Sequence, residues 1–232
     1  MTLKNHPTLG TDTISLRGDS LRPSGADIEA FIRGDRKLTD TLFDLSLKLH
    51  GLPEEQRSAA ISGYRNELIG AKISRTNLLY TGRWFMGMEE IVAFADEFNN
   101  GERRMSKALF TQTAPLLPKR VSLTASREVA EAFAAYGDIK ADVRQFGVVL
   151  ALDARKVEYY HIDTYIVQAG LRNNPNAVAM HWADEEEVRV NGLRKESVIG
   201  VDIHKNGTSI LSSNSFPSEH ALMARINAIV GK

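Results

Sequence analysis

The hydrophobic period of this chain changes near Thr76, and this change limits the folds that the chain can adopt. Before Thr76, apolar residues recur three or four positions apart, which is the spacing of one face of a helix. After Thr76, β-branched and aromatic segments are separated by turn residues, which is typical of short strands. Helices first and strands later predict an α+β fold.

Residues 26–74 are predicted to form a lobe of three helices. Ser24 and Asp27 have the spacing of a capping pair for the first helix, which ends at Gly34. A second helix follows, and the third starts at Pro53. Apolar stripes are expected on all three helices of this lobe: Ile28, Phe31 and Ile32 on the first, Leu38, Leu42, Leu45 and Leu49 on the second, and Ile61, Tyr64 and Leu68 on the third.

Residues 75–232 are predicted to form a β-rich core. A strand over 76–85 contains Gly82, which indicates that another segment approaches this strand closely. A second short strand ends at Thr124, after which Ser126 caps a helix. The inward-facing residues expected on that helix are Val129, Ala130, Phe133 and Ala134. Further strands are expected over 146–152, 157–162, 165–167, 187–190 and 197–203.

Residues 1–25 are polar and lack a sustained period, so they predict a mobile leader or an address segment. The N-terminal residues lack the hydrophobic stretch of a secretory signal, which predicts a cytoplasmic location in the producing cell. With 29 basic and 29 acidic residues, bulk charge indicates neither a nucleic-acid binder nor a membrane-surface protein. The absence of cysteine excludes thiol nucleophiles, disulfides and cysteine-ligated metals.

Common nucleotide-binding and catalytic motifs are absent from the sequence. It contains neither a G-x-G-x-x-G fingerprint nor a G-x-x-x-x-G-K-[ST] loop. No G-x-S-x-G elbow holds a serine nucleophile. The six histidines show no H-E-x-x-H or H-x-x-x-H spacing, so we expect neither a zinc hydrolase nor another metal site.

An acidic segment from Met180 to Val190 reads M-H-W-A-D-E-E-E-V-R-V. If a strand begins at Glu185, alternation puts Glu185 and Glu187 on one face and Glu186 on the other. A carboxylate pair at the start of a strand is suited to chemistry in which positive charge develops. The alternative is a charged loop that leads into an edge strand, where glutamates discourage pairing with other chains.

Three segments occur in the order, and at about the spacing, of a known set of motifs. They read L-L-Y-T-G-R-W at 78–84, S-L-T-A-S-R-E-V-A-E-A-F-A at 122–134 and W-A-D-E-E-E-V-R-V at 182–190. Together they resemble the arginine-serine-glutamate ADP-ribosyltransferases, a family that includes bacterial toxins and effectors. Over residues 75–205 the resemblance implies a split β-sandwich core that uses NAD as a substrate and no metal. The helices before it resemble the helical lobe of many members.

The resemblance also implies roles for individual residues. Glu187 is the implied catalytic residue, whose carboxylate stabilises the oxocarbenium-like ribose as NAD is split. Glu185 would orient or deprotonate the acceptor side chain. A glutamate at this position goes with arginine acceptors in the family. Trp182 matches an aromatic position that touches the protein substrate. Thr124 and Ser126 match the outer positions of the S-T-S motif and would hold the glutamate and the nicotinamide ribose, while also ending a strand and capping a helix.

The first motif, around Tyr80, departs from the family pattern. Thr81 occupies the position at which the family has its NAD-binding arginine. Arg83 lies two residues further, on the same face as Thr81 in a continuing strand, and is the implied replacement. Its planar guanidinium is suited to phosphate, which threonine is not. Tyr80 and Gly82 belong to the same implied NAD site, where Gly82 would let backbone amides approach the nicotinamide amide.

The leading interpretation is a mono-ADP-ribosyltransferase that acts as a toxin or effector, delivered into the cytoplasm of another cell. Its expected partners are NAD and an unidentified target protein, without a membrane. Two alternatives stay open. In the first, the chain has the same fold but transfers ADP-ribose to water or to nucleic acid, which makes it a NAD glycohydrolase or a nucleic-acid modifier. Otherwise Thr81 marks a decayed site, and the chain is a non-enzymatic interaction protein.

Overall fold

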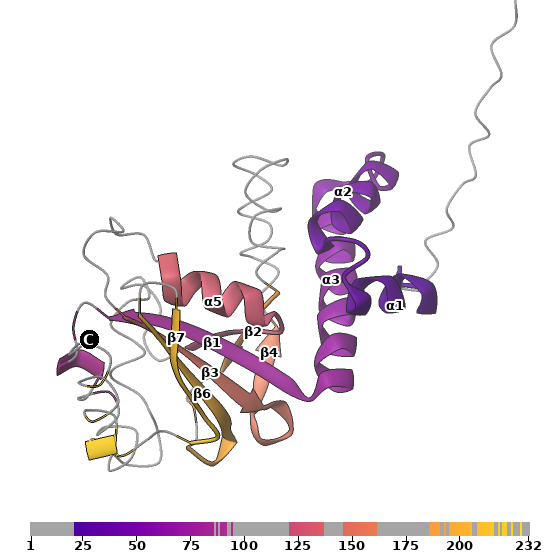
Figure 1. The fold of residues 1–232 in the computed structure, drawn as a ribbon. Helices are drawn as coiled ribbons and strands as arrows, with labels where there is room; N and C mark the ends of the chain where they lie inside the picture. Colours follow the sequence, from indigo (N-terminus) through magenta and orange to yellow (C-terminus); the bar gives the residue numbers. More distant parts are fainter. Residues whose placement is uncertain are drawn as a thin grey trace, which may run out of the picture.

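A computed structural model describes residues 21–85, 87, 89–91, 94, 121–136, 146–161, 186–190, 193, 195–205, 208–215, 218, 220, 221, 224 and 228. In this part of the chain, helices from the first half stand beside a sheet formed mainly by the second half (Figure 1). The α+β class predicted from the sequence is confirmed.

The helical lobe consists of α1 (Gly25–Arg33), α2 (Leu38–Lys48) and α3 (Glu54–Thr76). Ser24 and Asp27 form the predicted capping box at the start of α1. Gly34 ends this helix in the left-handed conformation, with φ of 75°. The predicted apolar residues of the lobe are at most 7% exposed, except Ile28 and Ile32, which are partly buried. The leucine spacing and the caps therefore predicted the lobe correctly.

The junction between α3 and the sheet lies slightly later than the sequence pattern predicts. Thr76 was expected to begin a strand, but it forms the last turn of α3, where its hydroxyl donates to the Lys72 carbonyl oxygen at 3.0 Å. Asn77 then adopts a left-handed conformation with φ of 55° and closes the helix through a bond from its N–H to the Ile73 carbonyl oxygen. Strand β1 (Leu78–Phe85) begins directly after this cap.

The described strands form one antiparallel sheet in the order β4-β5-β2-β1-β3-β6-β7. After β1 they are β2 (Val121–Thr124), β3 (Phe146–Asp153), β4 (Tyr159–His161), β5 (Glu187–Val190), β6 (Val198–Lys205) and β7 (Thr208–Ser213). Short 3-10 turns over Ala154–Lys156 and Lys195–Ser197 precede β4 and β6. Strand β7 was not predicted, because its residues are mostly polar and lie partly exposed at the edge of the sheet. The strand predicted over 165–167 lies outside the described residues.

Helix α5 (Arg127–Tyr136) covers one face of the sheet (Figure 1). A Cβ atom on Gly82 would lie 1.7 Å from the Ala130 carbonyl oxygen, and one on Gly147 would lie 2.5 Å from that of Ala134. The close approach predicted at Gly82 is therefore made by α5. The prediction that Phe133 faces inward is wrong, since its side chain is 47% exposed. Backbone contact at this distance leaves room under α5 for alanine but not for a ring.

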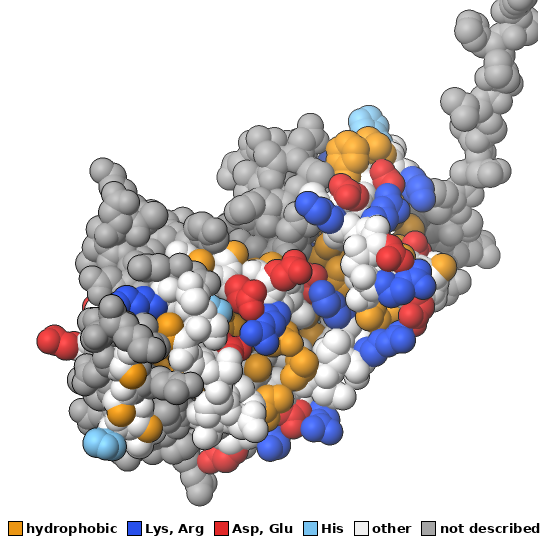
Figure 2. Space-filling view, viewed as in Figure 1, with side chains coloured by type: hydrophobic (Ala, Val, Ile, Leu, Met, Phe, Trp, Pro, Cys, Tyr) orange, Lys and Arg blue, Asp and Glu red, His pale blue; other side chains and the backbone are white. Residues whose placement is uncertain are grey.

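The opposite face of the sheet shares one hydrophobic core with the helical lobe. Leu68 and Ile73 of α3 belong to the same buried cluster as Leu79 of β1 and Val188 of β5. Lobe and sheet are therefore packed together through apolar side chains. On the face of the lobe seen in Figure 2, side chains of both charges are interspersed. Within the described residues, no helix combines the length and the apolar character needed to cross a bilayer.

Candidate functional site

The sheet brings the three motif-bearing segments together, because β1, β2 and β5 are neighbours. Glu187 of β5 pairs with Thr124 of β2, and Thr124 pairs with Tyr80 of β1. Side chains of directly paired residues in antiparallel strands point to the same face of the sheet. These three predicted site residues therefore form a row on the face that α5 covers.

The Glu187 carboxylate is enclosed and held by two neighbours on this face. Its side chain is 9% exposed, and Glu187 is the first residue of β5. The Ser122 hydroxyl donates a hydrogen bond to Glu187 Oε1. Arg189 Nε lies 3.2 Å from the same oxygen. A carboxylate with these charge-assisted contacts stays in one orientation, as chemistry at a sugar centre requires.

Sequence reasoning missed both Ser122 and Arg189. Ser122 lies two residues before Thr124, and Arg189 lies two residues after Glu187, so strand alternation was the available signal. The antiparallel register pairs Ser122 with Arg189, which puts their side chains together beside Glu187. This register was not predictable from the separate segments.

The two hydroxyl residues assigned from the second motif lie where β2 meets α5. Thr124 Oγ1 accepts a hydrogen bond from the Ser126 backbone N–H at 3.0 Å. Ser126 Oγ accepts one from the Val129 backbone N–H at 3.4 Å, as the predicted helix cap does. Thr124 is 5% exposed, so it contributes to the enclosed row beside Glu187. The hydroxyl that donates to Glu187 Oε1 comes from Ser122, two residues before Thr124 in β2.

On β1, Tyr80 and Gly82 lie beneath α5 on the same face as Glu187. Tyr80 packs against Ala130, Ala134 and Val149. Burial raises the pKa of the Tyr80 phenol above its ordinary value. The missing side chain of Gly82 accommodates the Ala130 carbonyl oxygen, so helix packing accounts for this glycine.

Arg83 shares a face of β1 with Thr81, as alternation predicts, and β1 pairs with β3 without a register shift between them. This face is opposite to that of Tyr80, because Arg83 is three residues away. The Arg83 guanidinium lies 5.3 Å from the centre of the Phe85 ring and 6.0 Å from that of Phe94. The structure therefore does not bring Arg83 to the face that carries Glu187.

Glu186 differs from its expected position in a strand. It lies in a turn with φ of 46°, and β5 begins one residue later. The alternation proposed from Glu185 onward therefore starts at Glu187, with Val188 and Val190 buried on the core face. Glu185 and Trp182 lie outside the described residues.

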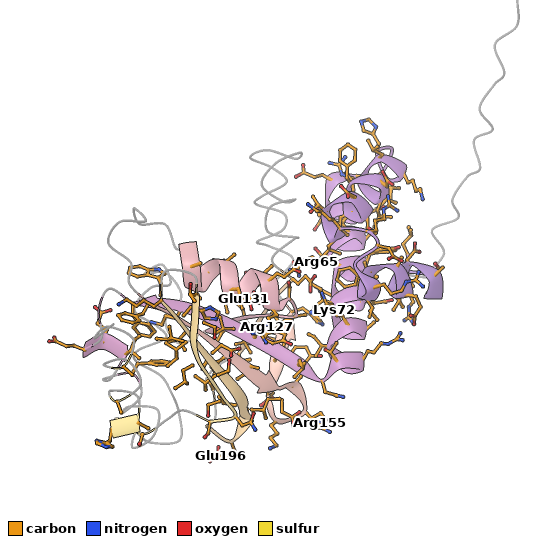
Figure 3. The ribbon with its side chains drawn as sticks, in the orientation of Figure 1. Arg65, Lys72, Arg127, Glu131, Arg155 and Glu196 are labelled. Atoms are coloured by element: carbon orange, nitrogen blue, oxygen red, sulfur yellow. The ribbon has the colours of Figure 1, made fainter. Side chains whose placement is uncertain are left out.

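Cationic side chains from α3 reach the segment that carries Glu187, and Figure 3 shows Arg65 and Lys72 on the side of α3 that faces the strands. Lys72 Nζ lies 2.8 and 2.7 Å from the two carboxylate oxygens of Glu186. Arg65 Nη2 donates to the Glu187 carbonyl oxygen at 3.3 Å. On the adjacent strand β4, burial lowers the pKa of His161, and the Arg65 cation adds to this effect.

In comparisons with known proteins, the chain matches no family model and no curated protein. Among the described residues, no three His, Asp or Glu side chains are grouped as they would be around a metal ion. What the geometry offers is an enclosed carboxylate with a hydroxyl and a guanidinium beside it. Such a group can stabilise a developing cation and can accept hydrogen bonds from sugar hydroxyls.

Proposed function

We propose that this chain is a NAD-dependent mono-ADP-ribosyltransferase that modifies an arginine side chain of a target protein and acts as an effector or toxin. The observation that carries the proposal is the enclosed Glu187 carboxylate at the start of β5. It stands in register with Thr124 and is held by Ser122 and Arg189. The three segments that resemble the family's motifs include the adjacent strands β1, β2 and β5, which further supports this function.

In the proposed reaction the bond between ribose C1′ and the nicotinamide nitrogen breaks, and its electron pair leaves with nicotinamide. The Glu187 carboxylate stabilises the positive charge that develops on the ribose. A guanidine nitrogen of the target arginine then forms a bond to C1′ and releases a proton. The resemblance assigns that proton to Glu185. NAD is a substrate here, and the chemistry requires no metal ion.

The fold required by this proposal is an ADP-ribosyltransferase core preceded by a helical lobe. The sheet flanked by α5 and the packing of α1 to α3 against its other face are compatible with such a core. A split β-sandwich contains two sheets, whereas the described strands belong to one. The proposal therefore requires a second sheet in addition to the one that the described strands form.

A decayed site in a non-enzymatic interaction protein is the second candidate, and one observation favours it. Thr81 stands where the family has its phosphate-binding arginine, and Arg83 lies over Phe85 on the opposite face from Glu187. NAD titration against the parent protein by calorimetry separates the two candidates. Saturable binding supports the transferase, whereas its absence favours the interaction protein.

The transferase is tested by incubating the protein with labelled NAD and a cell lysate. We expect label on a protein band, none with Glu187→Gln, and parent-level labelling with Glu196→Gln, whose exposed side chain lies away from the site. Glu185→Gln should release nicotinamide but label protein poorly, because Glu185 serves the acceptor. Release of nicotinamide without any labelled macromolecule would instead identify a NAD glycohydrolase, and label on nucleic acid would identify a nucleic-acid modifier.

A further inference from the structure

The residue just before Glu187 has an unfavourable backbone conformation. Glu186 has φ of 46°, which lies in the left-handed region that side chains with a Cβ rarely adopt. Such a conformation persists only where surrounding contacts hold it. Since Glu186 is directly bonded to Glu187, whatever holds this turn also sets where β5 begins.

Contacts with α3 and with β2 help to hold the turn at Glu186. Lys72 of α3 binds both carboxylate oxygens, and the two side chains are only 19% and 11% exposed. The Glu186 carbonyl oxygen accepts a hydrogen bond from the Ala125 backbone N–H at 3.3 Å, which joins the turn to the end of β2. An ion pair shielded from water to this degree interacts far more strongly than one at the surface.

A second cation on the same face of α3, Arg65, contacts Glu187 itself. Arg65 lies seven residues before Lys72, which is two helical turns, and it is 2% exposed. Its Nη2 donates to the carbonyl oxygen of Glu187. Lys72 Nζ also lies 5.1 Å from the centre of the Phe31 ring, which links it to α1. Two cations of one helix thus contact two consecutive residues at the start of β5.

We propose that Lys72 is a positioning residue, which holds the Glu187 carboxylate in its reactive orientation through its ion pair with Glu186. The proposal rests on the proposed function for its catalytic consequence. Without Lys72, the enclosed Glu186 carboxylate loses this ion pair, and the left-handed turn relaxes to bring that carboxylate to water. Glu187 then moves with its neighbour, although none of its own contacts has been changed.

The consequence is a selective effect on turnover. Displacing a catalytic group by about 1 Å lowers a rate by up to about a hundredfold. Lys72 contacts Glu186 rather than the proposed NAD site, so the loss should fall on kcat and leave KM for NAD nearly unchanged. A purely structural ion pair would instead lower the melting temperature and leave the turnover of the folded protein intact.

The test compares Lys72→Met with Arg75→Gln, a matched control on the same helix. Arg75 pairs with Glu29, but these side chains are 56% and 49% exposed. We expect Lys72→Met to lower kcat for nicotinamide release by about tenfold to a hundredfold and to accelerate hydrogen exchange at the Ala125 amide. Arg75→Gln should change neither, and Lys72→Arg should restore most of kcat because it keeps a cation.

A second pair of variants isolates the backbone conformation. Glycine adopts positive φ without strain, so Glu186→Gly should keep the turn, whereas Glu186→Ala should lose it. We therefore expect kcat to be higher and exchange at Ala125 slower in Glu186→Gly than in Glu186→Ala. Equal losses in the two variants would overturn the claim that the turn conformation is what positions Glu187.

Exchange and turnover together separate this inference from the proposed function. Parent-level kcat and exchange in folded Lys72→Met would overturn the positioning role and leave the transferase standing. If the parent does not split NAD, the proposed function and the catalytic consequence fail together. Exchange at Ala125 then still decides whether Lys72 holds the start of β5, with faster exchange in Lys72→Met supporting it and unchanged exchange refuting it.

Discussion

The two faces of the sheet use the same strands for different purposes. The face under α5 carries Glu187 with Ser122 and Arg189 beside it. The other face packs on the helical lobe, and there Arg83 lies over aromatic rings next to an apolar core. Tyr80 and Arg83 are only three residues apart, yet an odd separation along a strand reverses the face. A residue close to a motif in sequence therefore need not belong to the site that the motif forms.

Glycine replacement at the contact between α5 and the first face should have the largest effect on stability. Gly82→Ala puts a Cβ atom 1.7 Å from the Ala130 carbonyl oxygen, so α5 must shift. We expect a loss of at least about 3 kcal/mol in the free energy of unfolding, the upper end of typical overpacking. Urea titration measures this loss.

Gly63→Ala is the control for that experiment, because a Cβ atom there meets nothing within 4 Å and the residue lies in α3. Alanine at an exposed helical position should stabilise the protein by about 0.5–1 kcal/mol. Unchanged stability in Gly82→Ala would mean that α5 does not pack against this face as described.

Two arginines, one on each face, sharpen the comparison. Arg189→Gln removes a charged contact to Glu187, so we expect nicotinamide release to fall about tenfold to a hundredfold, as for the loss of a hydrogen bond to a charged group. Arg83→Met keeps an apolar side chain beside Phe85 and should leave release within about threefold, with a loss of about 1 kcal/mol in stability. The role expected for Arg83 from the sequence predicts the opposite ranking, and kinetics on the two variants distinguish them.

The smallest expected effect is a change in the pH dependence of stability, caused by His161 on the face of the sheet that packs on the helical lobe. His161 has a folded-state pKa below the ordinary value of 6.5, because it is partly buried and lies near Arg65. Between these two pKa values the unfolded chain binds more protons than the folded chain. The contribution of His161 to the free energy of unfolding is therefore fully present above about pH 6.5 and is lost as the pH falls below that value. Urea titrations at pH 7.5 and pH 5 should show a smaller loss for His161→Gln than for the parent. The exposed His50→Gln serves as control, and an identical loss in all three proteins would exclude His161 as a contributor.

Local signals in the sequence were enough to predict the α+β class and most of the described helices and strands. Leucine spacing and the Ser24 and Gly34 caps predicted the lobe, because a helix depends mainly on residues within a few positions. Gly82 correctly indicated a close approach to β1. Strand β7 was missed because a partly exposed edge strand carries little apolar alternation.

The site was less predictable, because its geometry depends on distant pairings. The hydrogen bond from Ser122 to Glu187 needs the register of β2 against β5. Glu186 lies in a left-handed turn, and its ion-pair partner Lys72 is 114 residues away in the sequence. Neither segment contains a signal for the other. For Arg83, the sequence did not show which residues of β1 share a sheet face with Glu187. The register of β1 against β2 puts Tyr80 on that face and Arg83 on the other.

The most direct test of the central claim is nicotinamide release from NAD by purified parent, Glu187→Gln and Glu196→Gln proteins. Glutamine keeps the shape of the side chain and removes the charge that stabilises the ribose cation. We predict that Glu187→Gln slows release by about two to three orders of magnitude, while Glu196→Gln, whose exposed side chain lies in the turn before β6, matches the parent. A folded Glu187→Gln protein that releases nicotinamide at the parent rate would contradict the assignment of Glu187 as the catalytic carboxylate.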